Sequence, residues 1–396
     1  MVSLIAALSL ASACGSATDP VSNGGPQPTA LTALPRALTA GEQAVVGAAN
    51  GFSFSLFRQV NTAQPGANVF TSPLSASMAL GMTMNGAANA TYDQMRSALA
   101  FGTASESDID QGYKSLIALL RGLDASVDFR IANSIWYSNT YPFNQSFLDA
   151  GTNYFDAKVS GLDFNNPSTV STINAWVSTA TNSRIPSIID TIDPDLKMVL
   201  VNAMYFKGAW RDKFDAALTG DAPFHGVGGD KTVKLMHRNA SMSYFSTPDF
   251  DAVDLPYGNT AFTMTVLLPK AGKSVETIAS TMQAADWASW TPLFRQFLVD
   301  LYLPRFAVTW ERQLNGDLQA LGMHDAFVVN GADFTRMSPR GKELLISYVK
   351  QKTFVDVNEE GTEAAAVTSV GVVATSAQIP FVFRVDRPFV FVLRER

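Results

Sequence analysis

Cysteine and histidine are nearly absent from this sequence of 396 residues, which contains one cysteine, Cys14, and three histidines. A single thiol cannot form a disulfide within the chain, so packing must stabilise the fold. The histidines, His225, His237 and His324, are widely spaced and no cysteine cluster accompanies them, so no metal site is expected. A histidine that pairs with a serine and an aspartate across the fold, as in a hydrolase, remains an alternative, although no local motif supports it.

Common enzyme motifs, basic stripes and long apolar runs are also missing. The motifs GxSxG, HExxH and GxxxxGKS/T do not occur. No apolar run reaches the roughly 18 residues that a membrane-spanning helix needs. The net charge is −6, without a basic stripe, so nucleic acid is not an expected partner. The composition, with 47% hydrophobic and 16% charged residues, predicts a globular protein with a large core and no cofactor.

The first 13 residues have the pattern of an export signal. An apolar segment, VSLIAALSLASA, is followed by Cys14 and resembles the end of a bacterial lipoprotein signal, in which the cysteine is lipidated after cleavage. No basic residue precedes the apolar run, and Ala11 stands where leucine is more usual. An ordinary secretory signal is therefore the alternative. Either signal predicts a protein outside the cell or in the cell envelope, with membrane contact only through an N-terminal lipid.

Residues 14–37 are rich in Gly, Ser, Thr and Pro, which predicts a flexible tether before a domain over residues 38–396. Within the domain, the spacing of apolar residues predicts helices over residues 44–60 and 169–181. A Ser-Pro helix-entry signal predicts another helix from residue 73. Runs rich in β-formers predict later strands over residues 129–138, 197–210, 262–269, 297–308 and 389–396, and HGVGGDK (225–231) predicts a hairpin loop. This order predicts an α+β domain with large, mainly antiparallel sheets.

The stretch NEEGTEAAAVT (358–368) resembles the hinge of a serpin reactive loop. Further matches to the family occur in order along the chain: NVFTSPLSASMAL (68–80), INAWVSTATNSRI (173–185), VNAMYFKGAW (201–210), LPYGNTAFTMTVLLP (255–269), LYLPRFAV (301–308), ADFTRMS (332–338) and DRPFVFVLRER (386–396). Residues 38–396 are therefore identified as a member of the serpin family. The resemblance implies about nine helices, an exposed C-terminal reactive loop and a monomer.

The resemblance also implies suicide inhibition of a serine protease. The protease attacks the loop and forms an acyl-enzyme, and the loop then inserts into a sheet as a new strand and distorts the protease. The catalytic nucleophile belongs to the target, so the protein itself is not an enzyme. A non-inhibitory serpin, acting as a binding or chaperone-like surface protein, is the alternative. Such members tend to carry proline, charged or bulky residues in the hinge, whereas this hinge carries none after Glu363.

The composition of the loop agrees with later burial as a strand. Side chains in a strand alternate between two faces, and one face here contains only small or β-branched residues: Thr362, Ala364, Ala366, Thr368, Val370 and Val372. The other face carries the single charge, Glu363, and Gly361 supplies the bend at the root. The predicted hinge consists of Glu359, Glu360, Gly361, Thr362, Glu363, Ala364, Ala365 and Ala366.

Family spacing implies a reactive bond between Thr375 and Ser376, with the neighbouring bonds on either side left open. The bait residues before it are Val372, Val373 and Ala374. Small residues suit the primary pocket of an elastase-like, chymotrypsin-like or subtilisin-like protease. A trypsin-like target would require arginine or lysine.

Two control regions carry over from the family. The shutter, where the main sheet opens, corresponds to Ser72, Ser75, Asn202 and Gln351. Many members have a histidine where Gln351 stands, so this network is expected to lack pH sensitivity. The breach, at the end of the sheet where the hinge enters, corresponds to Trp210, Arg305 and Glu359, of which the last two are expected to form an ion pair.

Overall fold

The computed structural model describes residues 27–362 and 379–396. The predicted lipidation site Cys14, the second half of the predicted hinge (363–366), the bait (372–374) and the reactive bond Thr375–Ser376 lie outside the described residues. Within them, no helix is both long and apolar enough to span a bilayer.

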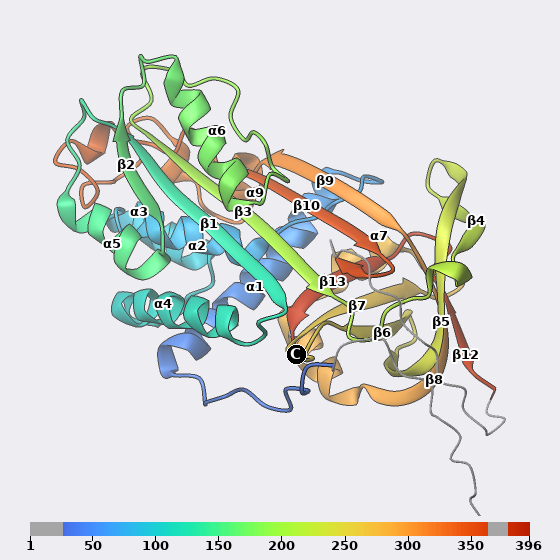
Figure 1. The fold of residues 1–396 in the computed structure, drawn as a ribbon. Coiled ribbons are helices and arrows are strands. Elements are labelled where there is room, and N and C mark those ends of the chain that lie inside the picture. Colours follow the sequence, from blue (N-terminus) through green and yellow to red (C-terminus); the bar gives the residue numbers. More distant parts are fainter. Residues whose placement is uncertain (1–26, 363–378) are drawn as a thin grey trace, which may run out of the picture.

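Nine α-helices occur in the described residues, and several gather at one end of the molecule (Figure 1). They are α1 (Ala40–Ala63), α2 (Pro73–Met84), α3 (Asn89–Ala98), α4 (Glu106–Gly122), α5 (Gln145–Phe155), α6 (Ser168–Ala180), α7 (Val275–Thr281), α8 (Ala284–Trp290) and α9 (Asn315–Ala320). Helix α1 begins at a capping box in which Thr39 and Glu42 each accept the other's backbone N–H. Its apolar stripe, with Val45, Phe52 and Leu56, is fully buried.

The first of two sheets has six strands in the order β2-β1-β3-β11-β10-β9. The strands are β1 (Val127–Ser138), β2 (Lys158–Leu162), β3 (Met198–Ala209), β9 (Phe306–Gln313), β10 (Lys350–Asn358) and β11 (Gly361–Thr362). Strand β3 pairs antiparallel with β1 and β11 but parallel with β10. The sheet therefore has a parallel seam at its centre.

The second sheet has seven strands, in the order β12-β8-β5-β6-β7-β13 with β4 paired on β5. The strands are β4 (Gly220–Gly226), β5 (Gly229–Ser246), β6 (Phe250–Pro256), β7 (Phe262–Pro269), β8 (Arg295–Pro304), β12 (Phe381–Arg384) and β13 (Val390–Glu395). Pairing is antiparallel except between β12 and β8. The two sheets confirm the α+β prediction, and the β4–β5 hairpin confirms the predicted loop at residues 225–231.

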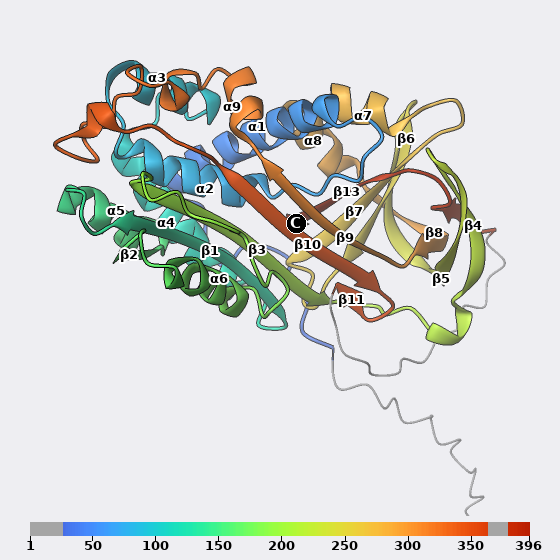
Figure 2. The same ribbon diagram turned by 90° about the horizontal axis from the view of Figure 1, so that it is seen from above.

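Strand β3 is buried on both faces because different layers cover them (Figure 2). Its even-numbered residues, such as Met204 and Phe206, face the main core between the sheets and helices α1 and α2. Val199 and Val201, on the other face, pack under α6 against Ile173. This two-sided burial explains why the sequence of β3 is an almost unbroken apolar run.

Two expectations differ from the structure. The predicted strand over residues 297–308 is two strands, because the chain leaves the seven-stranded sheet at Pro304 and enters the six-stranded sheet at Phe306. The predicted tether also ends earlier than residue 37. From Gln27 onward the chain lies on the domain: Leu31 N donates to Asn259 O at 2.6 Å, and the Thr260 hydroxyl donates to Leu31 O at 3.0 Å.

The end of this segment is held by an ion pair whose contribution to stability depends on pH. Arg36 donates to the buried Glu42 carboxylate at 2.5 and 2.7 Å, and these hydrogen bonds lower the pKa of Glu42 from 4.5 to about 2. A pKa that is lower in the folded state stabilises the fold above the unfolded pKa, and this stabilisation is lost as the pH falls through the folded pKa.

We therefore expect Arg36→Met to lower the midpoint of thermal unfolding at about pH 7. The difference from wild type should shrink between about pH 5 and pH 2, because Glu42 becomes protonated in both proteins. Arg130→Met is the control, since its pair with Asp128 is solvent-exposed and should contribute little. A difference that stayed constant over this pH range would contradict the assignment.

Candidate functional site

The first residues of the predicted hinge already lie inside the six-stranded sheet. Strand β11 pairs on one side with β3, where Thr362 is opposite Gly208, and on the other with β10, where Thr362 is opposite Val357. The Thr362 side chain is buried, and its hydroxyl lies 2.7 Å from the hydroxyl of the fully buried Tyr257. The structure therefore places Thr362 on the core face of the sheet.

Glycine is required where β11 begins. Gly361 has φ of 151°, a conformation that other residues rarely adopt, and a Cβ added there would lie 2.1 Å from the Gly208 carbonyl oxygen. The turn formed by Glu359 and Glu360 can therefore bring the chain between two strands only because position 361 has no side chain.

Beyond β11, strands β3 and β10 pair directly with each other. Three residues of each strand form this parallel seam, from Asn202 opposite Gln351 to Met204 opposite Thr353. Between the seam and Thr362 the two strands diverge to accommodate β11. A longer β11 would have to replace the seam, so these three pairs resist further entry of the hinge.

The four predicted shutter residues meet directly behind the seam, and all are buried. Gln351 holds both backbone groups of Ser72: its amide nitrogen donates to Ser72 O at 2.8 Å, and its oxygen accepts from Ser72 N at 2.9 Å. The Ser75 hydroxyl donates to the side-chain oxygen of Asn202. The first turn of α2 therefore connects separately to each strand of the seam, through Ser72 to β10 and through Ser75 to β3.

Sequence reasoning missed further members of this network. Asn202 also donates to the side-chain oxygen of Asn133 on β1 at 2.7 Å, and the Thr353 hydroxyl donates to the carbonyl of Phe70. The Ser72 hydroxyl is directed at the Met204 sulfur at 2.9 Å. The sequence offered one indication, because Asn133 lies in the apolar-rich middle of β1 and buried amides are usually hydrogen-bonded.

The three predicted breach residues surround the turn between β10 and β11. Arg305 binds one carboxylate oxygen of Glu359, with its Nε at 2.7 Å and its Nη2 at 2.5 Å. Trp210 holds the backbone of the same turn: its indole N–H donates to Asn358 O at 2.8 Å and its backbone N–H to Glu360 O at 2.9 Å. The turn is therefore fixed at its side chain and at its main chain.

Glu359 is a carboxylate at neutral pH although its side chain is almost fully buried. Burial alone would raise the pKa of Glu359, but hydrogen bonds from Arg305 and Thr219 outweigh this effect and lower it. Removal of either donor would leave a buried charge poorly compensated, which is a costly arrangement. Thr219 was not predicted from the sequence.

Tyr257 is a further residue near the turn that the sequence did not single out. Its ring stacks on Trp210 with centroids 4.5 Å apart and an interplanar angle of 16°, and its hydroxyl contacts Thr362. It thus lies under both the turn and the first inserted side chain. Its burial depends on the packing of the two sheets, which the local sequence does not reveal.

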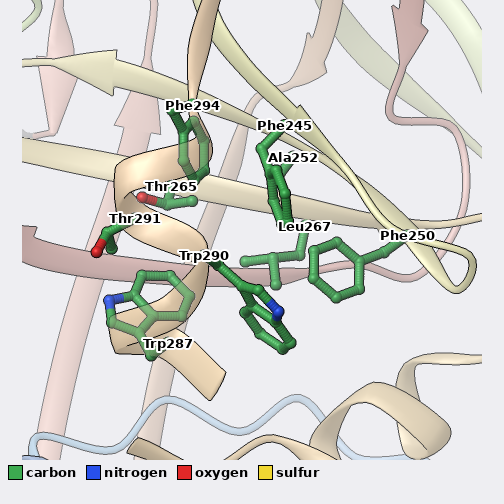
Figure 3. Close-up of a pocket in the computed structure, with 9 residues that line it drawn as sticks. All are labelled: Phe245, Phe250, Ala252, Thr265, Leu267, Trp287, Trp290, Thr291 and Phe294. Carbon is green, nitrogen blue, oxygen red and sulfur yellow. The ribbon is translucent and has the colours of Figure 1, made fainter. Parts of the chain in front are cut away.

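An aromatic cluster lies between β6, β7 and α8 (Figure 3). Its lining residues are Phe245, Phe250, Ala252, Thr265, Leu267, Trp287, Trp290, Thr291 and Phe294. The rings fill the space: Phe250 and Trp290 have centroids 5.1 Å apart, and no void in the cluster admits a water molecule. The cluster is therefore packed core.

No metal site appears within residues 27–362 or 379–396, since no three His, Cys, Asp or Glu side chains converge there.

Comparison with known proteins identifies the family. The model of the family "Serpin (serine protease inhibitor)" matches residues 47–396. The chain belongs to the serpin family. Leukocyte elastase inhibitor of Sus scrofa is 36% identical over 357 residues, covering 87% of this chain and 93% of that protein. Serpin B11 of Mus musculus is 32% identical over 368 residues, covering 88% and 95%.

Solved serpin structures superpose on the model. The thermophilic serpin Tengpin in its native state gives a TM-score of 0.79 at 31% identity and covers 93% of this chain and 94% of its own. A structure of thyroxine-binding globulin in complex with thyroxine gives a TM-score of 0.80 at 25% identity, with coverage of 90% of this chain and 95% of its own. The predicted serpin fold is therefore confirmed.

The two hydrogen bonds between the Gln351 amide and the Ser72 backbone should contribute strongly to the thermal stability of this serpin. Gln351→Ala would leave one buried N–H and one buried carbonyl unpaired, at about 1–3 kcal/mol each. We expect a fall of roughly 5 °C or more in the midpoint of thermal unfolding, followed by circular dichroism. Gln296→Ala is the control, because this exposed amide bonds only other surface side chains. Equal midpoints for the two variants would refute the assigned contribution.

Proposed function

We propose that this serpin is a suicide inhibitor of serine proteases that traps its target by inserting residues 363 onward between β3 and β10. The observation that supports this most strongly is the position of β11, whose residues already pair with both strands. Strands β3 and β10 lie on either side of β11 where the hinge enters, and they pair directly with each other beyond its last described residue, Thr362. Insertion would extend an existing strand, which avoids the cost of starting a new one.

The register of β11 favours insertion of the small residues that follow. Thr362 pairs with Gly208 and Val357, so Ala364 would lie opposite Phe206 and Val355, which are both buried. Four residues later Thr368 would lie opposite Asn202 and Gln351, where its hydroxyl would reach the shutter amides. Side chains at even-numbered positions would face the core, and each is small or β-branched.

The free energy gained on insertion of the loop would be large enough to distort an attached protease. About a dozen new backbone hydrogen bonds, at roughly 0.5–1.5 kcal/mol each, together with apolar burial, exceed the cost of opening the three-residue seam. The sum is comparable to the net stability of a whole domain. Since the gain is realised only after the loop is cut, the native state is kinetically trapped.

The target would be a protease with a shallow apolar primary pocket. The bait Val372-Val373-Ala374-Thr375 contains only small residues, and leukocyte elastase inhibitors of several mammals are similar to this chain.

We also propose export from a bacterial cell and a lipid anchor at Cys14, with the inhibitor acting as a monomer at the cell envelope. Replacement of Cys14 by serine would release the protein from membranes if this anchor exists.

Incubation with elastase, chymotrypsin, subtilisin and trypsin tests the proposal. We expect an SDS-stable covalent complex with at least one of the first three proteases and none with trypsin, because no basic bait residue is present. A released peptide beginning near Ser376 should appear in mass spectra. Cleavage of the loop without any complex, and without a rise in thermal stability, would instead favour a non-inhibitory binding or chaperone-like serpin.

A pair of neighbouring substitutions tests insertion itself. Ala364→Glu would force a carboxylate into the core face during insertion, so the protease should escape and the protein should become largely a substrate. Ala365→Glu places the same charge on the opposite face, opposite Tyr205, over which the Arg130 guanidinium lies at 5.8 Å. We expect the number of inhibitor molecules consumed per inactivated protease to rise several-fold for Ala364→Glu only. An equal effect of both variants would contradict the proposed register.

A further inference from the structure

We infer that the target protease makes a second contact with this serpin, on an apolar rim formed by Phe297, Ile379 and Phe381. This inference rests on the proposed inhibitory function, because it specifies where the attacking protease sits. The rim lies where the chain enters β12, beside the start of β8 (Figure 1).

Two of the rim side chains, Phe297 on β8 and Phe381 on β12, come from paired strands, and Ile379 lies just before β12. Strand β12 runs parallel to β8 with Phe381 opposite Val299, and Ile379 precedes Phe381 by two residues, as Phe297 precedes Val299. Tyr244 joins the rim, with its ring centroid 4.8 Å from that of Phe381 and 5.3 Å from that of Phe297.

The rim is an outward continuation of the core. On the same face, two residues further along β12, Phe383 is 1% exposed, whereas Phe381 is 39%, Phe297 is 48% and Ile379 is 96% exposed. A single exposed apolar side chain needs no explanation, but here Phe297 and Phe381 pack against one tyrosine and Ile379 projects into solvent two residues before Phe381. Such a group of neighbouring exposed apolar side chains marks a contact surface. Strand β12 is also the outermost strand of its sheet among the described residues, so no further strand covers it there.

Chain length determines what must approach this surface. Ile379 is three residues beyond Ser376 and Phe381 is five, and an extended chain spans at most about 3.6 Å per residue. A protease bound at the reactive bond is therefore within roughly 18 Å of the rim. A domain of roughly 200 residues has a radius of gyration of about 16 Å, so its surface on the leaving-group side of the cleft must reach Ile379. The occupant is accordingly a protease with an apolar surface on that side.

Association kinetics of exposed-residue variants test the rim. Ile379→Ser and the double variant Phe297→Ser/Ile379→Ser should lower the second-order rate constant of complex formation by about tenfold with the protease that wild type traps. The limiting rate at saturating protease and the stoichiometry of inhibition should stay unchanged, because docking is weakened while insertion is not. Val382→Ser is the control, since Val382 is 56% exposed on the same strand but on the opposite face.

The possible failures are distinguishable. If wild type forms no covalent complex with any protease, the proposed function fails. If wild type forms complexes and the rim variants associate as fast as wild type, or no slower than Val382→Ser, the rim inference alone is overturned. Sedimentation of wild type and Ile379→Ser without protease tests self-association: a dimer that is lost in the variant would assign the rim to a second copy of the chain and would also overturn the inference.

Discussion

The pairing of β3 with β10 is the interaction on which the rest of this structure depends. Only three residues of each strand form the seam, yet the strands are fixed from behind by α2, which bonds Gln351 through Ser72 and Asn202 through Ser75. Because each of these buried polar groups would be costly to leave unpaired, the seam resists opening more than its length suggests. In the proposed mechanism, this short and largely polar seam is the barrier that insertion of the loop would have to cross.

Whereas the seam resists opening, the gap that leads to it is already occupied by the start of the hinge. Gly361 and Thr362 already occupy the gap, and Trp210 and the Arg305–Glu359 pair fix the turn that leads into it. The entropy of ordering the first hinge residues has therefore been paid in the native fold. Under the proposed mechanism, insertion would separate the seam pairs one after another and replace each pair with a loop residue that is hydrogen-bonded to both strands.

The sequence predicted elements whose pattern is local and missed features that depend on tertiary contact. Strand β7 has the predicted bounds, and α6 differs by a residue at each end, because both are defined by their own periodicity. The change of sheet at Arg305 was missed although Pro304 marks the end of a strand. The apolar residues on both sides gave one continuous pattern, and the exchange of partner strands is a tertiary feature. The docked segment before residue 37 was missed for a related reason: backbone hydrogen bonds at Leu31 hold it, and composition does not record those.

Glutamine at position 351 leaves the shutter without an ionisable side chain, so its hydrogen bonds do not depend on pH near neutrality. The amide satisfies both backbone groups of Ser72 without an ionisable atom, and its described neighbours in the network are amides, hydroxyls and a thioether. The carboxylates that fix other parts of the fold, Glu42 and Glu359, have pKa values below their ordinary range, so they remain charged until the medium is acidic. Between about pH 5 and pH 8 neither the seam nor the breach therefore gains or loses a proton. Under the proposed mechanism, cleavage of the loop would then be the event that releases the stored free energy.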